Sequence, residues 1–378
     1  MGKTEFTFPV GYHQFHKEQL YNFQLNRWYS LGYARFEDME DAGKRIRTFD
    51  EWKMVMLQLA EKAVSEDRLM NAAFLYRAAE FYTLPKDPDK EILYDKFIEL
   101  FYKVFQNDQI ERFTIPYMDT FLPAIKVPAA TGNSKGTIVV HGGFDSFIEE
   151  FYSWMRYFAD NGYEVIAFEG PGQGAALKKY GLPLTIEWEK PVKAVLDNYK
   201  LENVTLIGIS MGGYLCFRAA AYEPRIARVI ASSIAFDYMQ IPPLPLQWLM
   251  WVFLQFDGMM NYAAREKMKK MPDHQWSVNN LMYITRTDTP MAAMKTFLQM
   301  NEKNLHSELV KQDVLILTGT EDHFIPLKMH DKQVKALTNA KSVTGRIFTR
   351  EEQAQNHCQI GNIGLALDTM LKWIEEKS

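Results

Sequence analysis

One serine in the chain lies in a setting that suits nucleophilic chemistry. "GISMG" (208–212) fits the pattern G-x-S-x-G and places Ser210 between an apolar run that resembles a strand and the helical stretch 213–224. A sharp strand-to-helix turn would lift Ser210 out of the sheet, and the small flanking residues would let the backbone make that turn. The N-terminus of the helix would add a positive dipole end for an oxyanion. The pattern predicts a nucleophilic serine, and the alternative is a chance match in a tight turn.

A nucleophilic serine needs a base, and two later segments supply a base and its partner. In the strand–G-x-S-x-G–helix arrangement the partners follow in the order Ser, acid, His. "LTGTEDHFIP" (317–326) offers Asp322 at the end of a strand, with Glu321 as the second choice, and "RIFTREEQAQNHCQIGN" (346–362) carries His357 in a loop. Of the eight histidines, only His357 combines this order with a loop position. We expect His357 to act as general base and Asp322 to orient its ring.

The segment "VVHGGFDS" (139–146) follows another predicted strand, where enzymes of this kind keep their second oxyanion donor. We expect the backbone N–H of Phe144, or that of Gly143, to join the N–H of Met211 in holding a developing O⁻. His141 is interpreted as a residue that stabilises the loop.

Other patterns argue against metals and cofactors. "FEGPGQG" (168–174) lacks the spacing of G-x-G-x-x-G, and no G-K-[ST] is present, so it is interpreted as a tight turn near the site. Two cysteines make neither a disulfide framework nor a zinc site. Glu149 and Glu150 are adjacent and would point in different directions on a helix, so they are not expected to form a paired-carboxylate site. We expect no metal and no cofactor.

Chain length, composition and net charge limit the class of protein. A chain of 378 residues suggests roughly two units. A hydrophobic content of 47% with 24% charged residues is typical of a globular protein. A net charge of −4 does not indicate the basic surface that binds nucleic acid. The N-terminal residues show no secretory h-region, and the apolar run 244–256 is too short to span a bilayer. We therefore expect a cytoplasmic enzyme with a small-molecule substrate.

Two kinds of segment must position these residues. Residues 1–110 have helical patterns, with apolar stripes interpreted as helix-to-helix core, and they show no polar cluster that would suggest chemistry of their own. From residue 111 onward, short apolar runs alternate with helical stretches, which indicates a parallel sheet covered on both faces. We predict a helical N-terminal cap at 1–110, core segments at 111–236 and 306–378, and a helical lid insertion at 237–305.

The predicted insertion is unusual in composition. It holds ten of the chain's twenty methionines, together with Trp248, Trp251 and Trp276. This composition favours a roomy apolar or aromatic acyl pocket, and the alternative is a buried lid face with no role in selectivity.

Several of these motifs together resemble a known family. "HGGFDSFIEE", "FEGPGQG", "GISMGGY", "TGTEDHFIP" and "NHCQIGN", with a helical N-terminal domain, resemble the FrsA-like α/β-hydrolases, a group that includes 2,6-dihydroxypseudooxynicotine hydrolase and fungal polyketide-shortening hydrolases. The resemblance implies the α/β-hydrolase fold, a Ser210–Asp322–His357 triad, a cap that includes the N-terminal domain, and a homodimer. It also implies hydrolysis of an ester or of a carbon–carbon bond next to a ketone. Some members use an extra acidic residue, for which Asp237 is a candidate counterpart.

Two other functions remain open at this level. An acyltransferase would use the same three residues, and the fold also serves as a non-catalytic ligand-binding protein.

Overall fold

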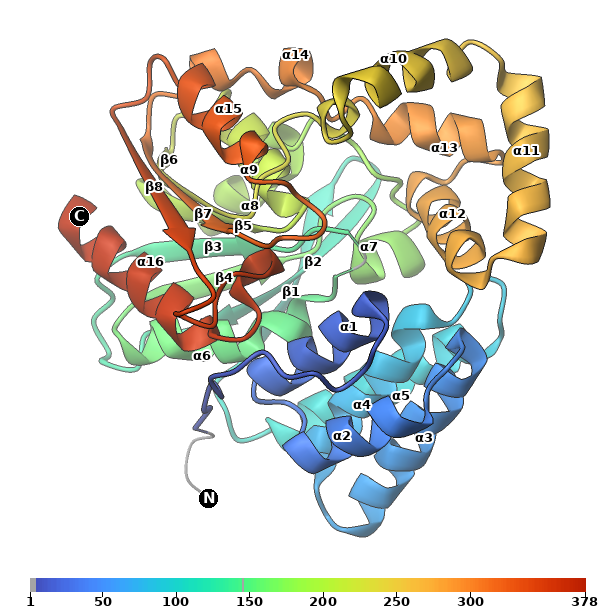
Figure 1. Ribbon diagram of the computed structural model, residues 1–378. Coiled ribbons are helices and arrows are strands. Elements are labelled where there is room, and N and C mark those ends of the chain that lie inside the picture. Colours follow the sequence, from blue (N-terminus) through green and yellow to red (C-terminus); the bar gives the residue numbers. More distant parts are fainter. Residues whose placement is uncertain (1–4, 145) are drawn as a thin grey trace.

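The computed structural model describes residues 5–144 and 146–378, and its centre is an eight-stranded sheet (Figure 1). The strand order is β1-β2-β4-β3-β5-β6-β7-β8. The strands are β1 (Glu111–Tyr117), β2 (Thr120–Val127), β3 (Thr137–His141), β4 (Glu164–Phe168), β5 (Val204–Ile209), β6 (Ile226–Ser232), β7 (Asp313–Gly319) and β8 (Ser342–Phe348). β1 and β2 form an antiparallel hairpin at one edge, and β3 to β8 pair in parallel. The expected mostly parallel sheet is confirmed.

Both faces of the sheet are buried, which explains why its strands show no polar alternation. Successive side chains of a strand point to opposite faces. In β3, Ile138 and Val140 join the core shared with the N-terminal helices, whereas Val139 joins the core on the other face. The carboxyl ends of β5 and β7 lie on the same edge of the sheet, which brings the loops after them together.

The N-terminal part is helical, as its apolar periodicity predicts. Its helices are α1 (Gln19–Ser30), α2 (Phe36–Arg45), α3 (Phe49–Ser65), α4 (Leu69–Tyr82) and α5 (Asp89–Val104). α3 begins with a capping box, in which the Thr48 side chain accepts from the Glu51 N–H and the Glu51 carboxylate accepts from the Thr48 N–H. Its apolar stripe, which includes Trp52 and Met56, is buried, as expected of a core between helices.

The remaining helices cover the sheet or form the insertion. Those that flank the strands are α6 (Tyr152–Asp160), α7 (Gly174–Lys178), α8 (Glu189–Tyr199), α9 (Gly212–Ala220), α15 (Lys328–Ala336) and α16 (Ile363–Lys377). The insertion contains α10 (Leu244–Phe253), α11 (Asp257–Lys270), α12 (Pro272–Thr285), α13 (Pro290–Phe297) and α14 (Glu302–Leu305). None of the helices described in 5–144 and 146–378 is long and apolar enough to cross a membrane.

The insertion meets the N-terminal helices beside the sheet (Figure 1). Trp276 of α12 contacts the rings of Phe81 and Tyr82 in α4 at centroid distances of 5.4 and 5.0 Å. The Trp276 indole N–H also donates to the carbonyl of Phe81 at 3.1 Å. Two segments almost two hundred residues apart therefore form one continuous wall.

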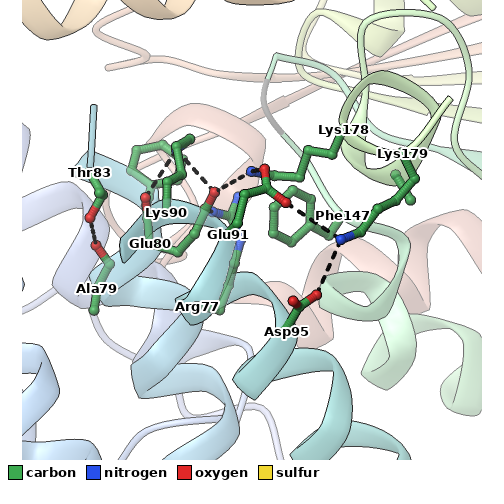
Figure 2. Close-up of polar contacts among 12 residues, drawn as sticks. Arg77, Ala79, Glu80, Thr83, Lys90, Glu91, Asp95, Phe147, Lys178 and Lys179 are labelled. Carbon is green, nitrogen blue, oxygen red and sulfur yellow. Dashed lines mark hydrogen bonds and ion pairs between the residues drawn. The ribbon is translucent and has the colours of Figure 1, made fainter. Parts of the chain in front are cut away.

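The N-terminal helices also contain a polar cluster that the sequence analysis did not foresee (Figure 2). Arg77 of α4 is fully buried, and it pairs with Glu80 and with Glu150, which lies in the short 3-10 helix Ile148–Phe151. Glu80 also lies 3.0 Å from the ammonium groups of both Lys90 and Lys178. Burial alone would raise the pKa of Glu80, but Lys90, Lys178 and Arg77 hold it well below its ordinary value. Arg77 and Glu80 are three residues apart on a largely apolar helix. The sequence pattern therefore did not indicate which residues of other segments would pair with them.

Replacing Arg77 should cost much of the stability of the fold. In Arg77→Met the charges of Glu80 and Glu150 lose a buried partner, and breaking a buried ion pair from one side costs about 3–5 kcal/mol. Chemical denaturation would measure the free energy of unfolding of this variant. Arg45→Met removes an exposed pair with Asp41 and serves as a control expected to change stability by about 0.5 kcal/mol or less. A loss as small as that of the control would contradict the structural role of Arg77.

Candidate active site

Ser210 lies at a strained turn between β5 and α9. Its φ is +61°, in the left-handed region that non-glycine residues seldom adopt. A Cβ on Gly208 would lie 2.0 Å from the carbonyl oxygen of Gly212, and a Cβ on Gly212 would lie 2.6 Å from that of Gly142. Larger residues cannot occupy either position in this turn. These close contacts explain why both outer positions of G-x-S-x-G are glycine.

The structure brings Ser210, His357 and Asp322 together. The Nε2 of His357 lies 2.8 Å from the Oγ of Ser210, and its Nδ1 lies 2.7 Å from the Oδ2 of Asp322. His357 begins a one-turn 3-10 helix after β8, and Asp322 follows the end of β7. Three residues that are distant in the chain thus form one continuous line of hydrogen bonds.

Further hydrogen bonds fix the Asp322 carboxylate. Its Oδ1 accepts from the backbone N–H groups of Phe324 and Ile325, both at 2.9 Å. Its Oδ2 also accepts from the hydroxyl of Ser233 at 3.1 Å, and that hydroxyl accepts from the N–H of Cys358. Ser233 was missed by the sequence analysis because a serine after a strand carries no distinguishing pattern.

Glu321, the second choice for the acid, lies elsewhere. It forms a surface ion pair with Arg350, in which the Arg350 Nε donates to the Glu321 Oε1 at 2.8 Å. Of the two adjacent acids, Asp322 is the one that contacts His357.

Burial and the neighbouring charge shift the pKa of His357 in opposite directions. Burial alone would lower the pKa of His357, but the adjacent Asp322 carboxylate outweighs that effect and raises this pKa above its ordinary value. Burial would likewise raise the pKa of Asp322, and His357 together with the backbone donors holds it below its ordinary value. The pair therefore favours an ionised aspartate beside a histidine that readily takes up a proton.

The loop after β3 approaches the turn that holds Ser210. An ideal Cβ on Gly143 would lie 2.7 Å from the backbone nitrogen of Met211. The N–H of Gly143 donates to the Ser146 hydroxyl at 3.3 Å, so one of the two predicted donors in this loop already has a hydrogen-bond partner. Within the described residues, the N–H groups of Phe144 and Met211 make no backbone hydrogen bond.

Gln173 ties that loop to its neighbour. Its side-chain amide donates to the carbonyls of Gly142 and Gly143 at 2.7 and 3.2 Å, and its Oε1 accepts from the N–H of Gly170. "FEGPGQG" is thus a turn near the site, as expected, with a buried glutamine that holds the backbone after β3.

A methyl group on Gly143 should damage this arrangement. In Gly143→Ala the new Cβ would lie 2.7 Å from the Met211 nitrogen and 2.8 Å from the Ile209 carbonyl oxygen, so the backbone must shift. We expect kcat to fall by about 10²–10³-fold, as when an oxyanion donor is lost. Steady-state kinetics on a chromogenic ester would measure it. Gly258→Ala, where a Cβ meets nothing within 4 Å, is the control, and equal activity of the two variants would contradict this role of the loop.

A cavity of about 410 Å³ opens beside Ser210 and His357, within the size range of small-molecule sites. Its walls come from α1, α4, the loop after β3, the insertion and the segment after β8. Most of the lining is apolar or aromatic, including Phe23, Phe151, Trp154, Phe297 and Phe324. Phe23 of α1 and Phe324 lie 6.0 and 5.0 Å from the His357 ring, so N-terminal and core residues jointly enclose the histidine.

The insertion contributes less to this cavity than its composition suggests. Of its three tryptophans, only Trp276 lines the cavity, and none of its ten methionines does. Trp248 and Trp251 are 67% and 59% exposed, and the described side chains of α10 and α11 include none that is buried. The cavity is apolar and aromatic, but of its described lining residues the insertion supplies only Tyr238, Ile241, Trp276, Ser277 and Phe297. The alternative of a buried lid face does not hold for α10 and α11, whose described side chains include none that is buried.

The other acidic candidates have structural partners. Asp237 caps the 3-10 helix Tyr238–Gln240 through the N–H groups of Met239 and Gln240, and it accepts from the N–H of Glu302. Glu150 pairs with arginines, and the carboxylate of Glu149 accepts from the Tyr102 hydroxyl at 3.0 Å. Among the described residues, no group of three or more His, Cys, Asp or Glu side chains could hold a metal ion.

Comparisons with known proteins agree with this architecture. A family model described as the alpha/beta hydrolase fold matches residues 138–274. Hydrolase acrC of Aspergillus aculeatus is 26% identical over 351 residues, covering 82% of this chain and 80% of that protein. The 20-hydroxy-prefusarin hydrolase FUS2 of Gibberella moniliformis is 31% identical over 282 residues, covering 68% and 66%. The crystal structure of the 2,6-dihydroxy-pseudo-oxynicotine hydrolase superposes with a TM-score of 0.65 at 21% identity, covering 92% of this chain and 94% of that one.

The chain is therefore an α/β-hydrolase. Its relatives are named hydrolases, and the predicted enzyme class is confirmed.

Proposed function

We propose that this enzyme is a serine hydrolase that acts through an acyl-enzyme. The observation that carries the proposal is the line of hydrogen bonds from Ser210 through His357 to Asp322. In this mechanism His357 takes the proton of Ser210 as the hydroxyl attacks a carbonyl carbon, and it then protonates the leaving group. Water, activated by the same histidine, hydrolyses the acyl-enzyme and regenerates Ser210.

The oxyanion of each tetrahedral intermediate would be held by the N–H groups of Met211 and Phe144. The approach of the Gly143 backbone to the Met211 nitrogen supports this pairing, as does the position of Met211 at the N-terminus of α9. Gly143 is the weaker candidate because its N–H already donates to Ser146.

The substrate would be an apolar or aromatic small molecule. The aromatic lining of the cavity and its volume of about 410 Å³ support this class, and both helical parts would act as caps over the site. The resemblance to FrsA-like α/β-hydrolases favours either an ester or a carbon–carbon bond next to a ketone as the bond that is cleaved. The same three residues serve both reactions.

Labelling with a fluorophosphonate probe, followed by peptide mass spectrometry, would test the proposal. We expect the probe on the peptide that contains Ser210 in the wild type and at least a hundredfold slower labelling in His357→Ala, because the serine then lacks its base. Equal labelling rates in both proteins, or a label only on other peptides, would contradict an activated Ser210.

Product analysis would then separate the reactions. Ester hydrolysis gives an alcohol and an acid, whereas cleavage next to a ketone gives an acid and a ketone or arene. A product that forms only when an alcohol or amine acceptor is added would instead indicate acyl transfer.

A further inference from the structure

One cation reaches the cavity from the N-terminal helices. The face of α1 that lines the cavity includes Phe23, Gln24 and Arg27. Among the described lining residues, Arg27 is the only Lys, Arg, Asp or Glu. Its side chain is 15% exposed, so part of it is accessible in a largely apolar space.

The Arg27 guanidinium is held firmly in place. One terminal nitrogen pairs with the Glu150 carboxylate, and the other donates to the Gln24 side chain at 3.3 Å. Its central carbon lies 4.9 Å from the centroid of the Trp28 ring and 5.4 Å from that of Phe81. A cation fixed in this way has already lost the side-chain entropy that binding an anion would otherwise cost.

The carboxylate that pairs with Arg27 is shared. Glu150 also accepts from Arg77, which in turn pairs with Glu80. Glu80 forms ion pairs with Lys90 and Lys178 as well (Figure 2).

Four cations of this cluster thus meet two buried carboxylates, and Lys178 has a third carboxylate 3.6 Å away in the half-exposed Glu91. The side chains of Arg77, Lys90 and Lys178 are 0–2% exposed, whereas that of Arg27 is 15% exposed, so Arg27 is the accessible end of the cluster.

We propose that Arg27 binds a negatively charged oxygen of the substrate, namely a carboxylate or an enolate. This inference rests on the proposed function and deepens it, because it names the substrate class as an anionic acyl compound. Guanidinium groups suit such oxygens, with paired donors in a planar fork.

The spacing on α1 indicates where that anion would lie. Phe23 contacts the His357 ring, and Arg27 comes four residues later, about 6 Å further along the helix axis. The anionic oxygen would therefore lie several bonds from the carbonyl that Ser210 attacks. Arg27 would set specificity and take no part in bond making.

A matched pair of esters tests the carboxylate form of the proposal. The substrates are p-nitrophenyl hydrogen pimelate, which carries a terminal carboxylate, and its neutral methyl ester. In the wild type we expect kcat/KM at pH 7.5 to be at least about tenfold higher for the charged ester. Arg27→Met should reduce that ratio at least tenfold, and Arg27→Lys should retain part of it because the charge remains.

Arg35→Met is the control, because Arg35 is the N-cap residue that precedes α2, is 44% exposed in its side chain and does not line the cavity. We expect the wild-type ratio in this variant. An unchanged ratio in Arg27→Met, or a wild-type preference for the neutral ester, would overturn the carboxylate form.

A β-diketone and its dimethylated, non-enolisable analogue form the second pair and test the enolate form in the same way. A lower preference for the enolisable compound in Arg27→Met, with no change in the pimelate ratio, would assign the site to an enolate. No change in either pair would overturn the proposal as a whole.

A binding measurement tests the role of Arg27 without depending on whether the protein is a serine hydrolase. Calorimetric titration with heptanoate and with heptanamide compares a charged and a neutral ligand without turnover. We expect the wild type to bind heptanoate at least about tenfold more tightly, with the difference lost in Arg27→Met. Equal affinities in the wild type would overturn the carboxylate form even if Ser210 is labelled. A charge preference without labelling of Ser210 would contradict only the serine hydrolase.

Discussion

Ser210→Ala should reduce kcat by about 10⁶-fold while leaving the fold intact. The alanine removes the hydroxyl that lies 2.8 Å from the His357 Nε2, and this hydroxyl is the nucleophile of the proposed mechanism. Some residual acceleration would remain, since binding and the oxyanion donors still act on attack by water. Steady-state hydrolysis of a p-nitrophenyl ester, with thermal melting to confirm folding, would measure the effect.

Ser134→Ala is the matched control, because Ser134 lies on an exposed loop before β3 and its hydroxyl bonds to nearby backbone. It should have wild-type kinetics. Retention of more than about 1% of kcat in Ser210→Ala would show that the reaction does not depend on this nucleophile.

Asp322→Asn should reduce kcat by about 10⁴-fold. The amide that replaces the carboxylate would donate to the Nδ1 of His357 and drive the ring proton to Nε2. That nitrogen would then face the Ser210 hydroxyl as a donor and could not accept its proton. Steady-state kinetics on the same p-nitrophenyl ester would measure the loss. Glu321→Gln is the control, because Glu321 pairs with Arg350 at the surface and should be dispensable.

The same variant should shift the pH profile. A general base works only when it is neutral, so activity falls as pH decreases through the pKa of His357. Asp322 raises that pKa, so its loss should lower the pKa and move the acid limb of kcat/KM to lower pH. A shift to higher pH, or a profile identical to that of the wild type, would contradict the role of Asp322.

Local patterns predicted which three residues meet at this site. The G-x-S-x-G motif specifies the turn locally. Backbone atoms of the motif and of the adjacent loop leave no room for a side chain at Gly208 or Gly212. The order of serine, acid and histidine follows from a parallel sheet whose strand ends meet on one edge. For these reasons Ser210, Asp322 and His357 could be selected from the sequence alone and are found in contact.

The walls of the cavity could not be predicted in the same way. Phe23, Arg27 and Trp276 reach the cavity through the packing of helices that are far apart in the chain, and no periodicity reports which distant surface a helix meets. Composition was misleading for the insertion, because an apolar α10 looks the same in sequence whether its side chains are buried or exposed. The partners of Arg77 could not be predicted either, because periodicity does not show which distant residues a buried side chain meets.

The most direct test of the account is a rapid-quench experiment with a chromogenic aryl ester on the wild-type enzyme. We predict a burst of about one equivalent of phenol, and a mass increase equal to the acyl group on the peptide that contains Ser210. Turnover that proceeds without an acyl group on that peptide, and that persists in Ser210→Ala, would contradict the acyl-enzyme mechanism.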